Sequence, residues 1–265
     1  MYKTQPLNCL IAIHMKQQLL QVLLKLPDYL YIHDTDTLRV AIWDAVNLSW
    51  NVDGIVDVKF GNSKRNLEFS TQKLGPMAYV IDRCTDYPYK SWYLRCIESE
   101  KALLDIVTKR ATFVFEITPG EVKLIDKNNP ELQHIVNKPY APGTLLEELL
   151  RSGINLMPVK EDDKLCGYQV KNKKVEERAI LEVATSVGAF ALRSSVWNKT
   201  LPPERVAIGI RLNLEYDKEF FEKDESEWKT FVWYEDKCGM TKLKDTDPDS
   251  KPELANGQVV SLHHK

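Results

Sequence analysis

The feature of this sequence that most constrains its fold is a series of short segments in which apolar and polar residues alternate. Alternation with a period of two is typical of half-buried β-strands, because successive side chains point to opposite faces of a sheet. The segments are 38–43, 56–60, 67–69, 77–81, 92–96, 113–117 and 122–125. So many short strands separated by turn residues favour an antiparallel β-sandwich over a parallel sheet, whose connections are longer.

Two of the turns between these segments carry signals of their own. Residues 61–66 are polar and turn-forming, so the segments on either side of them are expected to pair as a β-hairpin. Residues 118–121 read Thr-Pro-Gly-Glu. Proline fixes φ at the second position and glycine accepts a positive φ at the third, which predicts a type II turn.

The N-terminal segment 10–26 has a different period. Its apolar residues recur at helical spacing and Pro27 follows, which predicts one amphipathic helix that packs on this chain or on a partner. Lysines and glutamines interrupt the segment and no small-residue cleavage site follows, so we expect no secretion signal. No apolar stretch approaches the roughly 20 residues that a bilayer crossing requires, so no membrane association is expected.

After residue 130 the pattern mixes helices and strands. Thr144 and Glu147 have the spacing of a capping box, which predicts a helix that starts there and ends at Gly153. Helical spacing predicts a second helix over 174–196. The charged residues 160–174 between them are expected to form a surface loop.

The remaining segments of this half are expected to be strands, an acidic surface and a tail. The expected strands are 168–170, 206–214, and a hairpin of 228–234 with 240–243 across Cys238-Gly239. Residues 218–227 are acidic and suit a basic partner or, more simply, a solvated face.

Together these patterns indicate a mixed β and α+β chain, with an antiparallel β-sandwich followed by an α+β domain. The expected divisions are an N-terminal helix and linker (1–34), the sandwich (35–130), the α+β domain (131–244) and a poorly ordered tail (245–265).

Charge and cysteine content exclude several classes of function. The 265 residues carry 36 Lys and Arg against 38 Asp and Glu, too balanced for the one-sided field that nucleic acids attract. The five cysteines are odd in number and include no CxxC pair, so neither a disulfide framework nor a zinc site is expected. A reducing compartment suits this composition.

Catalytic and metal-binding motifs are not found in the sequence. It contains no phosphate-binding GxxxxGK[ST], GxGxxG, HExxH or GxSxG pattern. Asp34 and Asp36 resemble a metal-binding pair but suit a polar turn better. The spacing of a calcium-binding loop begins at Asp245, but Ser250 and Asn256 occupy the positions where such a loop requires glycine and glutamate. The histidines have no other metal-ligating residue at a suitable spacing. We therefore assign no catalytic, cofactor-binding or metal-binding residue, and expect no enzyme.

Aromatic residues are the best candidates for contacts with other molecules. Six tryptophans combine large apolar area with one hydrogen-bond donor, which suits both cores and protein interfaces. The interface candidates are Tyr87, Tyr89, Lys90, Trp92, Tyr93 and Arg95. Exposed aromatics on a sandwich also stack on sugars, so a carbohydrate-type ligand-binding module, or an enzyme with a site assembled only in space, stays open as the alternative.

Six segments of the chain together carry a resemblance to a known family: 38–44 (Leu-Arg-Val-Ala-Ile-Trp-Asp), 48–50, 87–95, 153–158, 183–197 and 253–257. In their sequence and in their order along the chain they resemble the cancer-susceptibility-candidate family of axonemal dynein accessory proteins. The sequence differs from the family pattern by lacking the long charged coiled-coil segment before the sandwich, of which 10–26 would be a remnant. It is therefore expected to be a fragment, a short paralogue or one portion of such a protein.

The resemblance implies a non-catalytic structural subunit of inner-arm dynein. Its implied partners are the dynein intermediate chain, other inner-arm dynein subunits and tubulin. Its implied location is the axoneme of the cilium or flagellum, within the cytoplasm and cytoskeleton. No cofactor and no catalytic residue is implied.

Overall fold

The computed structural model describes residues 12–16, 19–35, 38–61, 65–125, 129–213, 227–235, 237–242, 245, 250 and 252–259. They form two compact units that interleave along the chain. The first, here called the sandwich unit, comprises Met1–Thr85, Lys127–Val136 and Gly143–Leu156. The second, here called the large-sheet unit, comprises Asp86–Asp126, Asn137–Pro142 and Met157–Lys265. No described helix is both long enough and apolar enough to cross a membrane.

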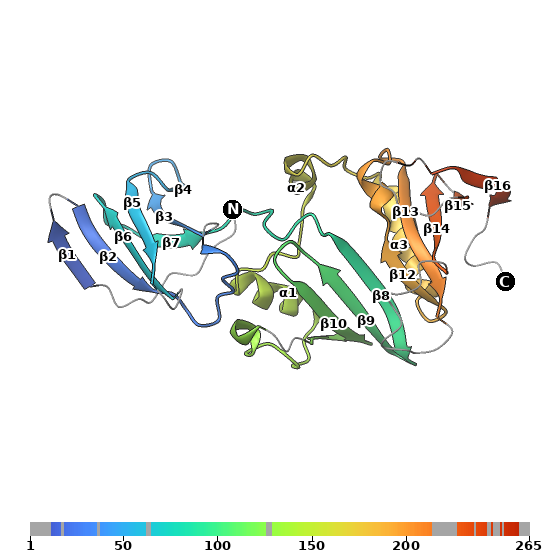
Figure 1. The fold of residues 1–265 in the computed structure, drawn as a ribbon, viewed down its shortest axis with the longest axis horizontal. Helices are drawn as coiled ribbons and strands as arrows, with labels where there is room; N and C mark the ends of the chain where they lie inside the picture. The colour runs from blue at the N-terminus through green and yellow to red at the C-terminus, as the bar shows by residue number, and fades with distance from the viewer. Residues whose placement is uncertain are drawn as a thin grey trace. The chain divides into compact units, whose positions relative to one another are not determined.

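The sandwich unit contains two antiparallel sheets (Figure 1). The four-stranded sheet has the order β1 (Ala12–Lys16), β2 (Leu19–Lys25), β6 (Asn66–Thr71) and β5 (Ile55–Phe60). The three-stranded sheet has the order β4 (Ser49–Asn51), β3 (Arg39–Asp44) and β7 (Met77–Val80).

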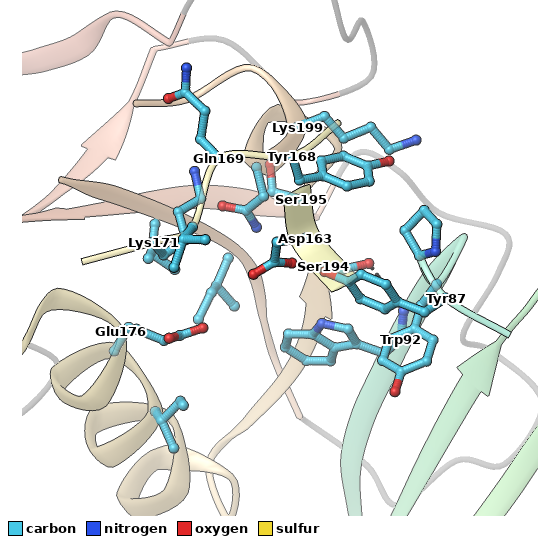
Figure 2. Close-up of a pocket in the computed structure, with 18 of the residues that line it drawn as sticks. Tyr87, Trp92, Asp163, Tyr168, Gln169, Lys171, Glu176, Ser194, Ser195 and Lys199 are labelled. Atoms are coloured by element: carbon cyan, nitrogen blue, oxygen red, sulfur yellow. Dashed lines mark hydrogen bonds between the residues drawn. The ribbon is translucent and has the colours of Figure 1, made fainter. Parts of the chain in front are cut away.

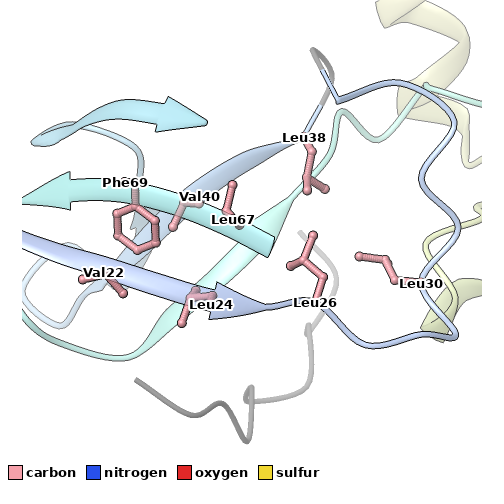
Figure 3. Packing of buried hydrophobic residues seen from close by; sticks show 8 residues of the cluster. All are labelled: Val22, Leu24, Leu26, Leu30, Leu38, Val40, Leu67 and Phe69. Atoms are coloured by element: carbon pink, nitrogen blue, oxygen red, sulfur yellow. The ribbon is translucent and has the colours of Figure 1, made fainter. Parts of the chain in front are cut away.

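The hydrophobic core cluster of the sandwich unit lies between these sheets (Figure 3). Alternate residues of β2 and β6 point inward, and residues of β3 and its approach meet them from the other sheet. The buried cluster is Val22, Leu24, Leu26, Leu30, Leu38, Val40, Leu67 and Phe69. Burying each of these side chains contributes about 1.5–3 kcal/mol relative to leaving it in water, so this cluster is the main stabilising element of the unit.

The described part of the large-sheet unit contains one antiparallel sheet of nine strands. Their order is β11 (Glu121–Leu124), β10 (Thr112–Thr118), β9 (Lys101–Val107), β8 (Ser91–Glu98), β12 (Phe190–Ser194), β13 (Arg205–Leu212), β14 (Lys229–Tyr234), β15 (Lys237–Thr241) and β16 (Leu254–Val259). Two meanders join where β8 pairs with β12, through Leu94–Leu192 and Tyr93–Arg193.

Among the residues that the structure describes, three α-helices accompany the sheets: α1 (Pro142–Arg151), α2 (Lys160–Leu165) and α3 (Lys173–Ser186). Short 3-10 helices occur at Pro130–Leu132 (η2) and Val196–Lys199 (η3). α3 lies against the face of β12–β14, where its Val175, Ala179 and Val183 pack in one cluster with Trp233 (Figure 1).

The predicted fold class is confirmed: the sheets are antiparallel and helices accompany them. All seven predicted strands between 38 and 125 are present, and β5 and β6 pair as the expected hairpin. Gly120 and Gly153 have φ of 80° and 81°, as the predicted turn and helix stop require. The sandwich, however, is formed by β1–β7, whereas β8–β11 belong to the nine-stranded sheet.

The predicted helix over residues 10–26 is wrong. Its described part forms the antiparallel strands β1 and β2. The leucine-rich stretch satisfies both periods, since Leu19, Val22 and Leu26 fit a helix face while Val22, Leu24 and Leu26 fit a strand face. The strand is selected because its alternate residues fill the sandwich core. The segment is therefore no coiled-coil remnant.

The predicted helix over 174–196 is also wrong beyond Ser186. The chain turns at 187–189 and returns as β12, because Ala191 and Leu192 are needed inside the sheet, where both are fully buried. Residues 160–165 form α2 instead of a loop, while the expected strand at 168–170 has no regular structure.

Smaller corrections concern element ends. α1 begins at Pro142, which suits a first helical position, so Thr144 lies inside the first turn and not at the cap. Cys238-Gly239 lies within β15, and the hairpin turns near Glu235 instead. Leu254–Val259 of the expected disordered tail forms β16. Residues 214 and 218–226 and most of 243–249 lie outside the described residues.

Candidate functional site

The large-sheet unit contains an open cleft with a volume of about 790 Å³ (Figure 2). One wall is the segment that leads into β8, and another is the connection between α2 and α3. The first turns of α3 and the end of β12 complete it, with Val206 and Ile208 of β13 in the floor.

The cleft lies where the pairing of β8 with β12 ends. Beyond Tyr93–Arg193 the regular ladder stops, and the amide of Trp92 donates instead to the hydroxyl of Ser194 at 3.1 Å. The next residue, Ser195, caps η3 by accepting from the amide of Trp197 at 3.3 Å. The backbone of β12 thus turns out of the sheet, which leaves room beside the indole of Trp92.

Three tyrosines form the aromatic wall. The ring of Tyr87 meets Tyr89 edge-on at 5.6 Å between centroids and lies 6.5 Å from the ring of Tyr168. The Tyr87 hydroxyl donates a hydrogen bond to the carboxylate of Asp163 on α2. Burial, followed by that hydrogen bond, raises the pKa of Tyr87, so its hydroxyl remains a proton donor at neutral pH.

A buried ion pair fixes the start of this wall. Asp86, which is 0% exposed, accepts from the Arg110 guanidinium with an Nε–Oδ1 distance of 2.8 Å. Arg110 stands in the turn between β9 and β10, so the pair joins the segment before β8 to the neighbouring hairpin. A charge-assisted pair of this geometry restricts where Tyr87 and the residues after it can lie.

The opposite wall carries Lys171 and Glu176. The ammonium group of Lys171 donates to the carbonyl oxygens of Leu201 at 2.8 Å and Pro202 at 3.4 Å, and burial lowers the pKa of Lys171. Burial, followed by the charge of Asp163, raises the pKa of Glu176. Both groups are therefore partly desolvated ionisable side chains facing the same space (Figure 2).

The side chains of this cleft are arranged for binding and not for catalysis. Within the described ranges, no group of three His, Cys, Asp or Glu side chains could hold a metal ion. Asp163 is engaged by a tyrosine and Lys171 by two carbonyls. What the cleft offers is aromatic and apolar surface bordered by charges, which is how binding pockets are commonly built.

Four of the six predicted interface residues line this cleft: Tyr87, Tyr89, Lys90 and Trp92. The other two point to the opposite face of the sheet. Tyr93 packs beside Ala191 and Trp228, and the buried Arg95 pairs with Asp105 at 2.7 Å. Sequence reasoning missed Asp163, Tyr168 and Lys171 because their charged segment predicts a solvated loop, and it missed Glu176 because a charged residue of a predicted helix suits a solvated helix face.

The fold and the cleft define an antiparallel β-scaffold with an open binding surface, and comparison with known proteins narrows this class. No protein-family model matches the chain. It is 27% identical to dynein axonemal intermediate chain 7 of Mus musculus over 85% of this chain and 31% of that protein. The Bos taurus protein of that name is 27% identical over 66% of this chain and 25% of its own length.

A third relative extends the similarity outside mammals. The dynein axonemal intermediate chain 7 homolog of Ciona intestinalis is 26% identical over 83% of this chain and 30% of its own length. The chain is thus distantly homologous to these dynein-named proteins over most of its length, and it spans about a quarter to a third of theirs.

Proposed function

We propose that this chain is a non-catalytic structural subunit associated with inner-arm dynein of the ciliary axoneme. The observation that carries the proposal is the distant homology to dynein axonemal intermediate chain 7 over as much as 85% of the chain. In this role the chain docks on the dynein intermediate chain and other inner-arm subunits, and contacts tubulin. Its location is the axoneme.

The architecture suits docking because both units present stiff antiparallel sheets. Interface energy is usually concentrated in a few aromatic and charged anchors, and the wall from Tyr87 to Trp92 supplies such anchors next to an open cleft. Tyr87, Tyr89, Lys90 and Trp92 would touch the partner. Tyr93 and Arg95 would support them from the far face of β8.

Fractionation of cilia tests this function. A tagged copy of the chain is expressed in ciliated cells, axonemes are isolated, and inner-arm dynein is released with salt. We expect the chain to co-sediment with the dynein intermediate chain, whereas a tagged β-sandwich protein of equal size stays in the soluble fraction. A chain that never enters the axoneme, or remains there after the intermediate chain is extracted, contradicts the proposal.

One observation favours a second function, the binding of a small ligand such as a carbohydrate. The cleft volume of about 790 Å³ matches ordinary ligand pockets, and tyrosines, Trp92 and three carboxylates line it. A thermal-shift screen of glycans and metabolites decides between the two. A ligand that stabilises the purified chain specifically, and fails to do so with Tyr168→Ala, would replace the docking function.

A further inference from the structure

The charge of the cleft differs in sign from that of the chain. The whole sequence has a formal net charge of −2. The cleft lining contains five lysines against three carboxylates. Positive charge is therefore concentrated here on an otherwise slightly acidic protein, and such a local field attracts an anionic group.

The three carboxylates of the lining are already compensated within the protein. Asp163 accepts the proton of the Tyr87 hydroxyl. Glu177 lies 3.5 Å from the ammonium group of Lys173. Glu176 is exposed as a residue, but partial burial of its carboxyl group, followed by the charge of Asp163, raises its pKa and so disfavours its ionised form. None of them offers a strong attraction to an incoming cation.

Three lysines of the lining are not compensated in this way. Lys90, Lys160 and Lys199 are exposed, and none of the ion pairs among the described residues involves them. They come from three separate elements: the segment before β8, α2 and η3. Because these positions surround the cleft, an extended ligand could meet more than one of them at a time.

Apolar surface lies between these charges. Trp92 and Ile208 form part of the lining, and Ile180 of α3 is 59% exposed beside them. Tyr168 is half-buried and belongs to a segment without regular structure. An apolar side chain that entered here would be removed from water, which adds to the electrostatic attraction.

We propose that this cleft binds an acidic peptide segment of a partner protein, with an apolar side chain between Trp92 and Tyr168 and carboxylates against Lys90, Lys160 and Lys199. The assignment rests on the proposed function, since it names the chemistry of one docking partner. A peptide is favoured over a nucleic acid because the lysines of the cleft are separated by the apolar surface of Trp92 and Ile208, and because the charge of the whole chain, 36 Lys and Arg against 38 Asp and Glu, is too balanced to attract a continuous phosphate chain.

Fluorescence anisotropy of the purified chain tests this assignment. The probe is a fluorescein-labelled peptide of glutamates flanking a single central phenylalanine. We expect saturable binding that weakens as NaCl rises from about 0.05 M to about 0.5 M, because salt screens exposed charges. Replacing the phenylalanine by serine should weaken binding several-fold.

Charge variants locate the binding site. The double variant Lys160→Glu/Lys199→Glu should weaken binding by about tenfold or more, as expected when two exposed ion pairs become repulsive contacts. Glu176→Gln should strengthen binding, because it removes negative charge from the cleft. Lys237→Glu on β15 is the matched control, since Lys237 is equally exposed but lies outside the cleft, and it should change affinity less than twofold.

Three outcomes would overturn the assignment. One is equal weakening by Lys237→Glu, and another is no effect of Tyr168→Ala or of the phenylalanine. The third is tighter binding of a labelled single-stranded oligouridine with the same variant dependence, which would identify a nucleic-acid site. Failure of peptide binding leaves axonemal co-fractionation untouched, so the two proposals fail separately.

Discussion

The two units of this protein bury different kinds of side chain. In the sandwich unit the core cluster consists only of aliphatic residues and Phe69. Every buried charged residue that the structure describes belongs to the large-sheet unit. They are Asp86, Arg95, Asp162, Glu182, Arg193 and Asp245. A core built from apolar contacts tolerates small changes of position, whereas buried charges require fixed partners.

This difference in buried side chains indicates which unit can build a binding surface. The core cluster of the sandwich unit consists of apolar side chains packed between two sheets, and no charged residue is buried in the described part of that unit. In the large-sheet unit, Glu182 inside the sheet–helix layer accepts from the indole of Trp233 at 3.1 Å and from Arg178 at 3.0 Å. Comparable polar anchors hold the aromatic wall of the cleft in place.

Removing one member of a buried ion pair should have the largest effect. Asp86→Ala leaves the Arg110 guanidinium, whose side chain is 6% exposed, without its carboxylate. We expect the free energy of unfolding of the large-sheet unit to fall by about 3–5 kcal/mol. Urea unfolding followed by hydrogen exchange, which reports the two units separately, measures this loss.

The control for that variant is a surface pair of the same unit. Glu98→Ala removes a carboxylate 3.3 Å from Lys101, and its own side chain is 61% exposed. An exposed pair is worth less than about 1 kcal/mol, so this variant should be nearly neutral. If Asp86→Ala were equally mild, buried charges would not distinguish the two units.

A core truncation tests the other half of the comparison. Leu67→Ala removes a side chain that is 0% exposed from the centre of the sandwich. The expected loss is about 2–5 kcal/mol, from lost burial and the cavity left behind. Hydrogen exchange should show the loss in β2, β3 and β6. Leu23→Ala on the outer face of β2 is the matched control, because Leu23 is 39% exposed and should cost far less.

The sequence predicts individual strands better than it predicts how they pair into sheets, and the reason is physical. Alternation along a single strand is a local property, so Val40 and Phe69 reveal their strands directly. The pairing of Leu94 with Leu192 joins residues far apart in the chain, and no local pattern encodes it. The division of the chain at residues 34, 130 and 244 likewise remains a prediction.

Only the aromatic part of the candidate site can be predicted from the sequence, for a similar reason. A dense run of aromatic residues is enough to mark 87–93 as an interface candidate. Asp163 lies in a charged stretch that predicts a solvated loop and Glu176 lies in a predicted helix, and only the fold brings both into the same cleft as Tyr87. Residues that meet from separate elements have no fixed spacing along the chain, so no sequence pattern marks them.

A glycine substitution probes how rigidly the buried charges are held. A Cβ at Gly209 would lie 2.7 Å from Cγ of Arg193, whose guanidinium is fixed by Asp245 at 3.1 Å and covers the ring of Trp228. Gly209→Ala should therefore cost about 1–3 kcal/mol, as overpacking does. Thermal unfolding measures it. Gly143→Ala in α1 is the control, since nothing lies within 4 Å of its Cβ and no loss is expected.

The smallest expected effect concerns the pH dependence of the cleft. Because the pKa of Glu176 is raised in the folded protein, the folded state binds more protons at this site than the unfolded state does. Its contribution to stability is therefore complete below the unfolded pKa of about 4.3 and is lost as pH rises through the folded value. Glu176→Gln removes this loss, so its Tm should exceed that of the parent at pH 7 by a small amount. The difference should vanish as the pH approaches about 4, where the parent residue is protonated too.

Glu121→Gln removes the same charge from an exposed position on β11 and serves as the control for net charge. A gain that is independent of pH, or equal in both variants, would mean that the carboxyl of Glu176 is not held in a desolvating cleft.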